Sequence, residues 1–167
     1  WEISQVRQVT SAMASSPVSP EALVDLALQE HSASIAYTYN EPTVFFEYTY
    51  DTAVLAHAQG IKNVYVSNGF MSADTLEALD ALRSDSLAFD LVLTDQTMPN
   101  LRGDHLAVAV LQLRPDIPIV LMTGYSAVID REDARKLGIK GFIDKPFSSL
   151  SLAGAVRCAL DSRLGSS

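Results

Sequence analysis

Five short apolar runs, spaced along the chain, constrain the fold more than any other feature of the sequence. Each run is nearly continuous rather than alternating with polar residues, which is typical of strands that are covered on both faces of a sheet. The runs are SIAYTYN (34–40), NVYVSNG (63–69), FDLVLTD (89–95), IPIVLMT (117–123) and GFIDKP (141–146). The sequence therefore predicts a five-stranded parallel sheet.

Segments with the helical spacing of apolar residues separate these runs. The predicted helices lie between about Pro42 and Gly60, after Ser72, and over 104–113, 130–137 and 149–164. Strands that alternate with helices favour a doubly wound α/β domain with right-handed crossovers and helices on both faces. One extra helix, over about 21–30, precedes the first strand. We expect all 167 residues, 1–167, to form a single domain.

The charge and the apolar content argue against two classes of protein. The formal net charge of −8 opposes the phosphate contacts that nucleic-acid binding requires. No apolar run approaches the roughly 20 residues that span a bilayer, and the opening WEISQVRQVTSAM lacks the basic start and apolar core of a signal peptide. We therefore predict a cytoplasmic protein that binds neither nucleic acid nor membrane.

Three chemically reactive side chains end three consecutive predicted strands. The third strand ends in Asp95, the fourth in Thr123, and the fifth carries Lys145 directly before Pro146. Ligands of open parallel sheets bind beyond the carboxyl ends of the strands. A carboxylate there would accept a phosphoryl group, which the hydroxyl and the ammonium would hold. Each residue alone is more typical of a turn, a helix cap or a solvated cation, whereas the combination of all three favours a phosphoryl switch.

Three motifs of the second half occur together: DLVLTDQTMPNLRGDHLA, PIVLMTGYS and GIKGFIDKPF. They resemble the response-regulator receiver domain of two-component signalling, over about residues 72–164. The resemblance implies a flavodoxin-like fold with strand order 2-1-3-4-5. It also implies a phosphorelay function, in which a histidine kinase or a phosphotransfer protein supplies a phosphoryl group and Mg²⁺ assists its transfer.

The same resemblance implies a role for each motif residue. Asp95 would be the phosphoacceptor and a metal ligand, Thr123 the switch hydroxyl, Lys145 the lysine that contacts the phosphate, and Phe142 the switch aromatic. Thr97 would offer its backbone carbonyl to Mg²⁺. Gly103 matches the glycine that follows the loop in this family, and a cis peptide bond is expected between Lys145 and Pro146.

The end of the first predicted strand departs from the receiver pattern. A receiver carries an acidic pair there, because a hard divalent cation prefers carboxylate oxygens. Tyr39, Asn40 and Glu41 occupy this region. Glu41 would supply one carboxylate and Asn40 a neutral oxygen, which predicts a weakened metal site. A plain strand-to-helix turn at Asn-Glu-Pro explains the same residues equally well, and the sequence leaves both interpretations open.

The first half of the chain carries other motifs, which are WEISQ, SPEALVDLAL and the stretch SIAYTYNEPTVFFEYTYDTAVLAHAQGIKNVYVSNGFMS. They resemble, over about residues 1–72, a radical S-adenosylmethionine enzyme of the pyruvate formate-lyase activating type. That resemblance implies that five residues would lie near bound S-adenosylmethionine: Asn40, Glu41, Ser67, Asn68 and Gly69. The single cysteine, Cys158, provides too few ligands for an iron–sulfur cluster, so we expect no cluster, and we assign Cys158 to helix packing.

The two resemblances meet near residues 69–76, inside an expected βα unit, which predicts a chimera. In a receiver arrangement the strand order is 2-1-3-4-5, whereas in a half-barrel the first three strands lie in chain order. The alternatives to a working receiver are a chimeric or engineered α/β scaffold without native activity, and a cluster-less fragment of a radical S-adenosylmethionine enzyme. The most enzyme activity that we expect is receiver-type self-phosphorylation. The sequence is also compatible with a homodimer.

Overall fold

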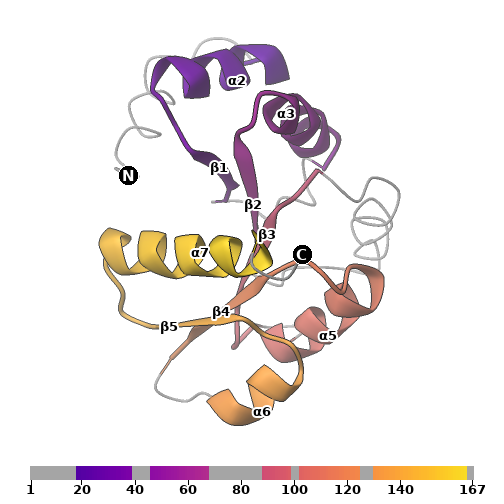
Figure 1. The fold of residues 1–167 in the computed structure, drawn as a ribbon, viewed down its shortest axis with the longest axis vertical. Coiled ribbons are helices and arrows are strands. Elements are labelled where there is room, and N and C mark those ends of the chain that lie inside the picture. Colours follow the sequence, from indigo (N-terminus) through magenta and orange to yellow (C-terminus); the bar gives the residue numbers. More distant parts are fainter. Residues whose placement is uncertain (1–17, 39–45, 68–87, 99–101, 125–129, 165–167) are drawn as a thin grey trace.

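Five parallel strands form the centre of the computed structural model, which describes residues 18–38, 46–67, 88–98, 102–124 and 130–164 (Figure 1). The strands are β1 (Ser34–Tyr37), β2 (Lys62–Ser67), β3 (Leu91–Asp95), β4 (Ile119–Thr123) and β5 (Gly141–Asp144). Every neighbouring pair is parallel. The predicted five-stranded parallel sheet is confirmed, and each strand overlaps its predicted run.

The order of the strands corrects one prediction. The strands lie in chain order, β1-β2-β3-β4-β5, and the predicted order 2-1-3-4-5 is wrong. The neighbour of β3 is β2, with Val64 paired to Leu91 and Ser67 paired to Thr94. β1 lies at the edge of the sheet. The first three strands lie in chain order, which is the order that the half-barrel alternative predicts.

The helices follow the predicted pattern closely. They are α2 (Pro20–Gln29), α3 (Phe46–Ala58), α5 (Gly103–Leu113), α6 (Arg131–Lys136) and α7 (Ser149–Leu164). The extra N-terminal helix is α2, and Ser19 caps it by accepting a hydrogen bond from the backbone N–H of Ala22 at 3.3 Å. The expected helix start at Pro42 and the expected helix after Ser72 lie outside the described residues. None of the helices in the described ranges is long and apolar enough to cross a membrane.

The strand order also decides which helices cover which face of the sheet. When each new strand joins on the same side, right-handed crossovers place the connecting helices on one face. In agreement, α3, α5 and α6 share one core with the sheet, whereas α7 packs on the opposite face against β3, β4 and β5 (Figure 1). α2 packs on α3 beyond the edge strand. Cys158 of α7 is exposed, so its assignment to helix packing is wrong.

A buried polar network fixes the start of β2 beside β3. Asp90 is 2% exposed, and its carboxylate accepts hydrogen bonds from the backbone N–H of Asn63 and from Lys62 Nζ, both at 2.9 Å. The side chain of Asn63 in turn accepts from the Tyr37 hydroxyl at 2.9 Å and donates to the carbonyl of Ala53 at 2.8 Å. Burial raises the pKa of Tyr37 well above its usual value, so its hydroxyl remains a donor. The network thus ties β1, β2, β3 and α3 together.

Removing the Asp90 carboxylate should destabilise the fold. In Asp90→Ala the buried N–H of Asn63 loses its acceptor, and we expect the free energy of unfolding to fall by about 1–3 kcal/mol. The matched control is Asp133→Ala, which removes an exposed carboxylate that pairs with the exposed Lys136 and should change stability little. Urea unfolding monitored by circular dichroism measures both. Equal stability of the two variants would contradict a structural role for Asp90.

Candidate functional site

The carboxyl edge of the sheet brings together two of the three predicted strand-end residues. Asp95 ends β3, and its side chain is 22% exposed. Lys145, which follows β5, donates a hydrogen bond from Nζ to Oδ2 of Asp95. The peptide bond between Lys145 and Pro146 is cis, as expected. An ammonium therefore already lies against the carboxylate that is expected to carry the chemistry.

The two-residue period of the strands explains why Asp95 and Lys145 meet. Successive side chains of a strand point to opposite faces of a sheet. Leu93 and Ile143 both pack into the core under α7. Asp95 lies two residues after Leu93, and Lys145 lies two residues after Ile143, so both emerge on the α7 side of the sheet edge.

The backbone after β3 also orients the Asp95 carboxylate. The N–H of Thr97 donates to Oδ1 of Asp95 at 3.3 Å, so both carboxylate oxygens have a donor. The N–H of Gln96 donates to the carbonyl of Met122 at 2.8 Å, which continues the pairing of β3 with β4 beyond the end of the strand. The carboxylate is therefore held at a rigid strand end.

Gly103 lies against the backbone of Asp95. A Cβ atom at Gly103 would lie 2.3 Å from the carbonyl oxygen of Asp95 and 2.7 Å from Cδ1 of Leu121, both far inside contact distance. The N–H of Gly103 donates to the carbonyl of Gln96 at 3.2 Å. Only glycine fits here without a shift, which gives a physical reason for the glycine that the sequence pattern singled out.

Asp104 joins the two ends of the loop that follows β3. Its carboxylate accepts hydrogen bonds from Nε2 of Gln96 at 3.2 Å and from Arg102, with Nε at 3.1 Å and the terminal nitrogen at 2.6 Å. Burial alone would raise the pKa of Asp104, but the hydrogen bonds from Arg102 and Gln96 outweigh burial and lower it. Asp104 is therefore an anion at neutral pH, and it fixes the loop beside Asp95.

Thr123 does not join Asp95 and Lys145. Thr123 lies two residues after Leu121, and Asp144 lies two residues after Phe142, and both of these apolar side chains pack on the side of α3, α5 and α6. Thr123 and Asp144 are direct neighbours across β4 and β5. The Thr123 hydroxyl donates to Oδ1 of Asp144 at 2.8 Å. The structure thus contains two separate pairs at the sheet edge, one on each side.

Asp144 and Arg131 belong to the site although sequence reasoning missed them. Arg131 donates to Oδ2 of Asp144, and the hydrogen bonds from Arg131 and Thr123 lower the pKa of Asp144. The guanidinium groups of Arg131 and Arg135 each lie 5.9 Å from the centre of the Phe142 ring. One feature of the sequence could have identified Asp144, which is its position directly before Lys145. Because adjacent strand residues face opposite sides of the sheet, Asp144 lies on the side opposite Lys145. No comparable signal marked Arg131.

The described residues alone do not form a magnesium site. Asn40 and Glu41, the predicted oxygen donors, lie outside the described residues. The strand beside β3 is β2, and it ends in Ser67, a buried hydroxyl rather than a carboxylate. Within the part of the chain that the structure describes, no three His, Cys, Asp or Glu side chains are placed to hold a metal ion. Mg²⁺ prefers an octahedral oxygen set, and Asp95 with the Thr97 carbonyl falls short of one without further donors.

Comparison with known proteins identifies relatives of this chain. The family model described as response regulator receiver domain matches residues 56–157. Response regulator protein FleR of Pseudomonas aeruginosa is 35% identical over 88 residues, which are 52% of this chain and 18% of that protein. Uncharacterized protein MJ0808 of Methanocaldococcus jannaschii is 41% identical over 70 residues, which are 41% of this chain and 21% of that protein. The matches thus span about a fifth of the length of each of these two relatives.

A solved structure supports the fold. The CheY-like response regulator receiver domain protein from Methanospirillum hungatei JF-1 aligns with a TM-score of 0.50 and 20% sequence identity, covering 77% of this chain and 94% of that chain. At this identity the likeness concerns the fold alone. The flavodoxin-like layering of a five-stranded parallel sheet between helices is confirmed, with the difference in strand order described above.

A side chain at Gly103 should disturb the site. We expect Gly103→Ala to lower the free energy of unfolding by about 1–3 kcal/mol, because the new methyl group overlaps the Asp95 carbonyl. The matched control is Gly154→Ala in α7, where nothing lies within 4 Å and the helix should gain about 0.5–1 kcal/mol. Thermal unfolding by calorimetry measures both changes, and a stabilised Gly103→Ala would refute the close contact.

Proposed function

Because the chain belongs to the response regulator receiver domain family, whose general function is phosphorylation on an aspartate, we propose that Asp95 is the phosphoacceptor of this protein. The observation that carries the proposal is the ion pair between Asp95 and Lys145 at the carboxyl edge of the sheet. The carboxylate lies at a rigid strand end, is partly accessible, and has a cation beside it. These are the properties that a carboxylate nucleophile for phosphoryl transfer requires.

The chemistry follows from these groups. A carboxylate oxygen of Asp95 bonds to the phosphorus of the donor while the bond between phosphorus and the donor's leaving atom breaks. The ammonium of Lys145 then moves from the carboxylate to the phosphoryl oxygens and neutralises their charge. The Thr97 N–H keeps the second carboxylate oxygen in place. Thr123 is the hydroxyl that would donate to the new phosphoryl group, and Phe142 is the aromatic side chain that would reorient with it.

Receiver domains generally use Mg²⁺ for phosphorylation, and we propose that this chain binds Mg²⁺ weakly. Among the residues that the structure describes, Asp95 and the backbone carbonyl of Thr97 are the donors that the receiver pattern assigns to the metal. Weak binding is expected because the neighbouring strand β2 ends in Ser67 and because Asp95 is paired with Lys145. The assignment of Glu41 as a ligand stays a prediction.

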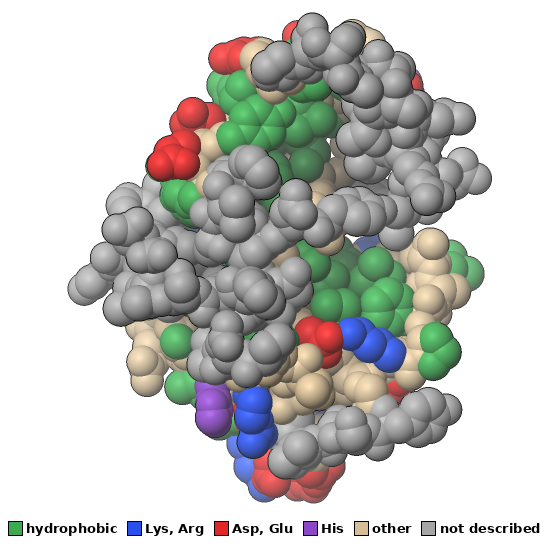
Figure 2. Space-filling model, turned by 180° about the vertical axis from the view of Figure 1, so that it is seen from behind, with side chains coloured by type: hydrophobic (Ala, Val, Ile, Leu, Met, Phe, Trp, Pro, Cys, Tyr) green, Lys and Arg blue, Asp and Glu red, His purple; other side chains and the backbone are tan. Residues whose placement is uncertain are grey.

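Receiver domains interact with histidine kinases or phosphotransfer proteins, and we propose such a protein as the phosphoryl donor here. The face formed by α6, β5 and α7 is the one that the change at Thr123 and Phe142 would alter. We retain the prediction that the chain binds no nucleic acid, because its formal net charge is −8 and Figure 2 shows acidic side chains at both ends of the molecule. Cytoplasmic location and a homodimer stay untested.

A second candidate is a chimeric scaffold without native activity. It is favoured by the chain order of β1, β2 and β3, which a half-barrel has and a receiver arrangement lacks. The family match begins at residue 56 and so includes β2, which this candidate assigns to the other parent. We propose that residues 1–72 derive from a barrel-type enzyme like those that use S-adenosylmethionine. With Cys158 as the single cysteine, the segment would act as scaffold rather than as a radical enzyme.

Phosphorylation of Asp95 is directly measurable. After incubation with acetyl phosphate and Mg²⁺, we expect intact-mass spectrometry to show one phosphoryl adduct on the parent protein. Asp95→Asn should show none, because the amide is not a nucleophile for this transfer, while the exposed control Asp133→Ala should match the parent. A folded parent without an adduct would favour the scaffold. An adduct on both the parent and Asp95→Asn would place the phosphoryl group elsewhere.

The contribution of Glu41 can be tested by titrating Mg²⁺. Because Glu41 is the predicted second carboxylate of the metal site, we expect Glu41→Gln to raise the Mg²⁺ concentration for half-maximal phosphorylation. The same titration of the parent is the reference. An unchanged Mg²⁺ concentration would remove Glu41 from the metal site and would agree with a strand order in which β2 lies between β1 and β3.

A further inference from the structure

The Thr123 hydroxyl carries a single proton and so donates one hydrogen bond at a time. In this structure the hydroxyl donates to Asp144 at 2.8 Å. A phosphoryl group on Asp95 would need the same proton. The carboxylate of Asp144 and a phosphoryl group on Asp95 therefore compete for one donor.

The surroundings of Thr123 make this competition effective. Thr123 is 6% exposed, so water offers its hydroxyl few alternative partners. The pairing of Thr123 with Asp144 across β4 and β5 is fixed by the sheet, and the backbone N–H of Lys145 also donates to the Thr123 carbonyl at 2.7 Å. Arg131 holds the other oxygen of the Asp144 carboxylate. The Asp144 side chain is 68% exposed, and its two carboxylate oxygens accept from Thr123 and Arg131.

We propose that Asp144 is a positioning residue that holds the Thr123 hydroxyl away from Asp95 in the unphosphorylated protein. It thereby opposes the switched state until a phosphoryl group on Asp95 offers a stronger acceptor. The part of this inference that concerns switching rests on Asp95 being the phosphoacceptor. The part that concerns the position of Thr123 does not.

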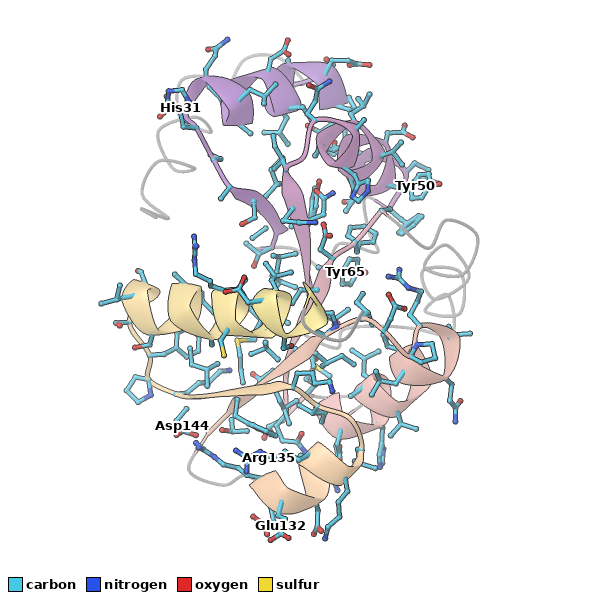
Figure 3. All side chains as sticks on the ribbon, viewed as in Figure 1. His31, Tyr50, Tyr65, Glu132, Arg135 and Asp144 are labelled. Carbon is cyan, nitrogen blue, oxygen red and sulfur yellow. The ribbon has the colours of Figure 1, made fainter. Side chains whose placement is uncertain are left out.

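The same contacts connect the switch to the surface of the molecule. Arg131 binds Asp144 and also lies over the Phe142 ring, where Arg135 joins it. Figure 3 shows Asp144 and Arg135 between β5 and α6, with Glu132 on the side of that helix that is turned away from β5. When Thr123 leaves, Asp144 keeps Arg131 as its partner, so the change at the sheet edge passes to α6 and to the packing of Phe142.

The first experiment measures the position of Thr123 without any phosphorylation. Three-bond couplings of the Thr123 methyl carbon in labelled protein give the ratio of its main side-chain rotamer to the others. We expect Asp144→Ala to lower this ratio roughly threefold to tenfold, the range for loss of one hydrogen bond. Asp144→Asn keeps an oxygen acceptor and should stay close to the parent. Asp133→Ala, an exposed carboxylate of α6 without contact to Thr123, should leave the ratio unchanged.

The second experiment measures the effect on switching. We expect the acetyl phosphate concentration for half-maximal phosphorylation to fall roughly threefold to tenfold in Asp144→Ala, because the competitor for Thr123 is gone. In a Thr123→Val background the same substitution should have no effect, which separates this role from a general change in charge. Asp133→Ala should match the parent.

The outcomes separate this inference from the proposed function. An unchanged rotamer ratio in Asp144→Ala overturns the inference. The inference also fails if Asp144→Ala leaves the acetyl phosphate concentration for half-maximal phosphorylation unchanged, or if it lowers this concentration equally in the Thr123→Val background. If no variant forms an adduct but the ratio still falls in Asp144→Ala alone, the phosphoacceptor assignment fails and the positioning of Thr123 by Asp144 stands.

Discussion

The pairing of β2 with β3 determines the rest of the structure. Asp90 accepts from the backbone of Asn63 and from Lys62, and it thereby fixes the start of β2 beside β3 in the buried part of the sheet. With the strands in chain order, right-handed crossovers place α3, α5 and α6 on one face and leave α7 to cover β3, β4 and β5 on the other. The same pairing makes β1 an edge strand. It also means that the strand beside Asp95 is β2, which ends in the hydroxyl-bearing residue Ser67.

The alternation of side chains along the strands then divides the sheet edge into two pairs. Asp95 and Lys145 emerge on the α7 side, and Thr123 and Asp144 emerge on the opposite side. In the proposed switch, a phosphoryl group on Asp95 would accept from Lys145 and would draw the single proton of Thr123 from Asp144. We propose that the site works as a switch between two hydrogen-bond partners of Thr123. Arg131 and Phe142 lie next to Asp144, the partner that Thr123 would leave.

The sequence predicted the elements better than their arrangement. The apolar runs and the helix boundaries, such as those of α7, follow from local periodicity, and the strand-end positions of Asp95, Thr123 and Lys145 follow from the ends of those runs. The strand order does not follow from local periodicity, because β1 and β2 are both apolar strands that fit beside β3. Which of the two pairs with β3 depends on buried contacts such as that between Asp90 and Asn63. The separation of Thr123 from Asp95 needed the register of β4 and β5, which residue types alone do not give.

Nuclear Overhauser effects between strands test the central claim most directly. In uniformly labelled protein, the order described here predicts backbone contacts between Val64 and Leu91 and between Val66 and Leu93, the pairs that lie side by side in β2 and β3. It predicts none between Ala36 of β1 and β3. Contacts from Ala36 to Leu91 or Leu93, in place of those from β2, would show the order 2-1-3-4-5 and would contradict this account of the site.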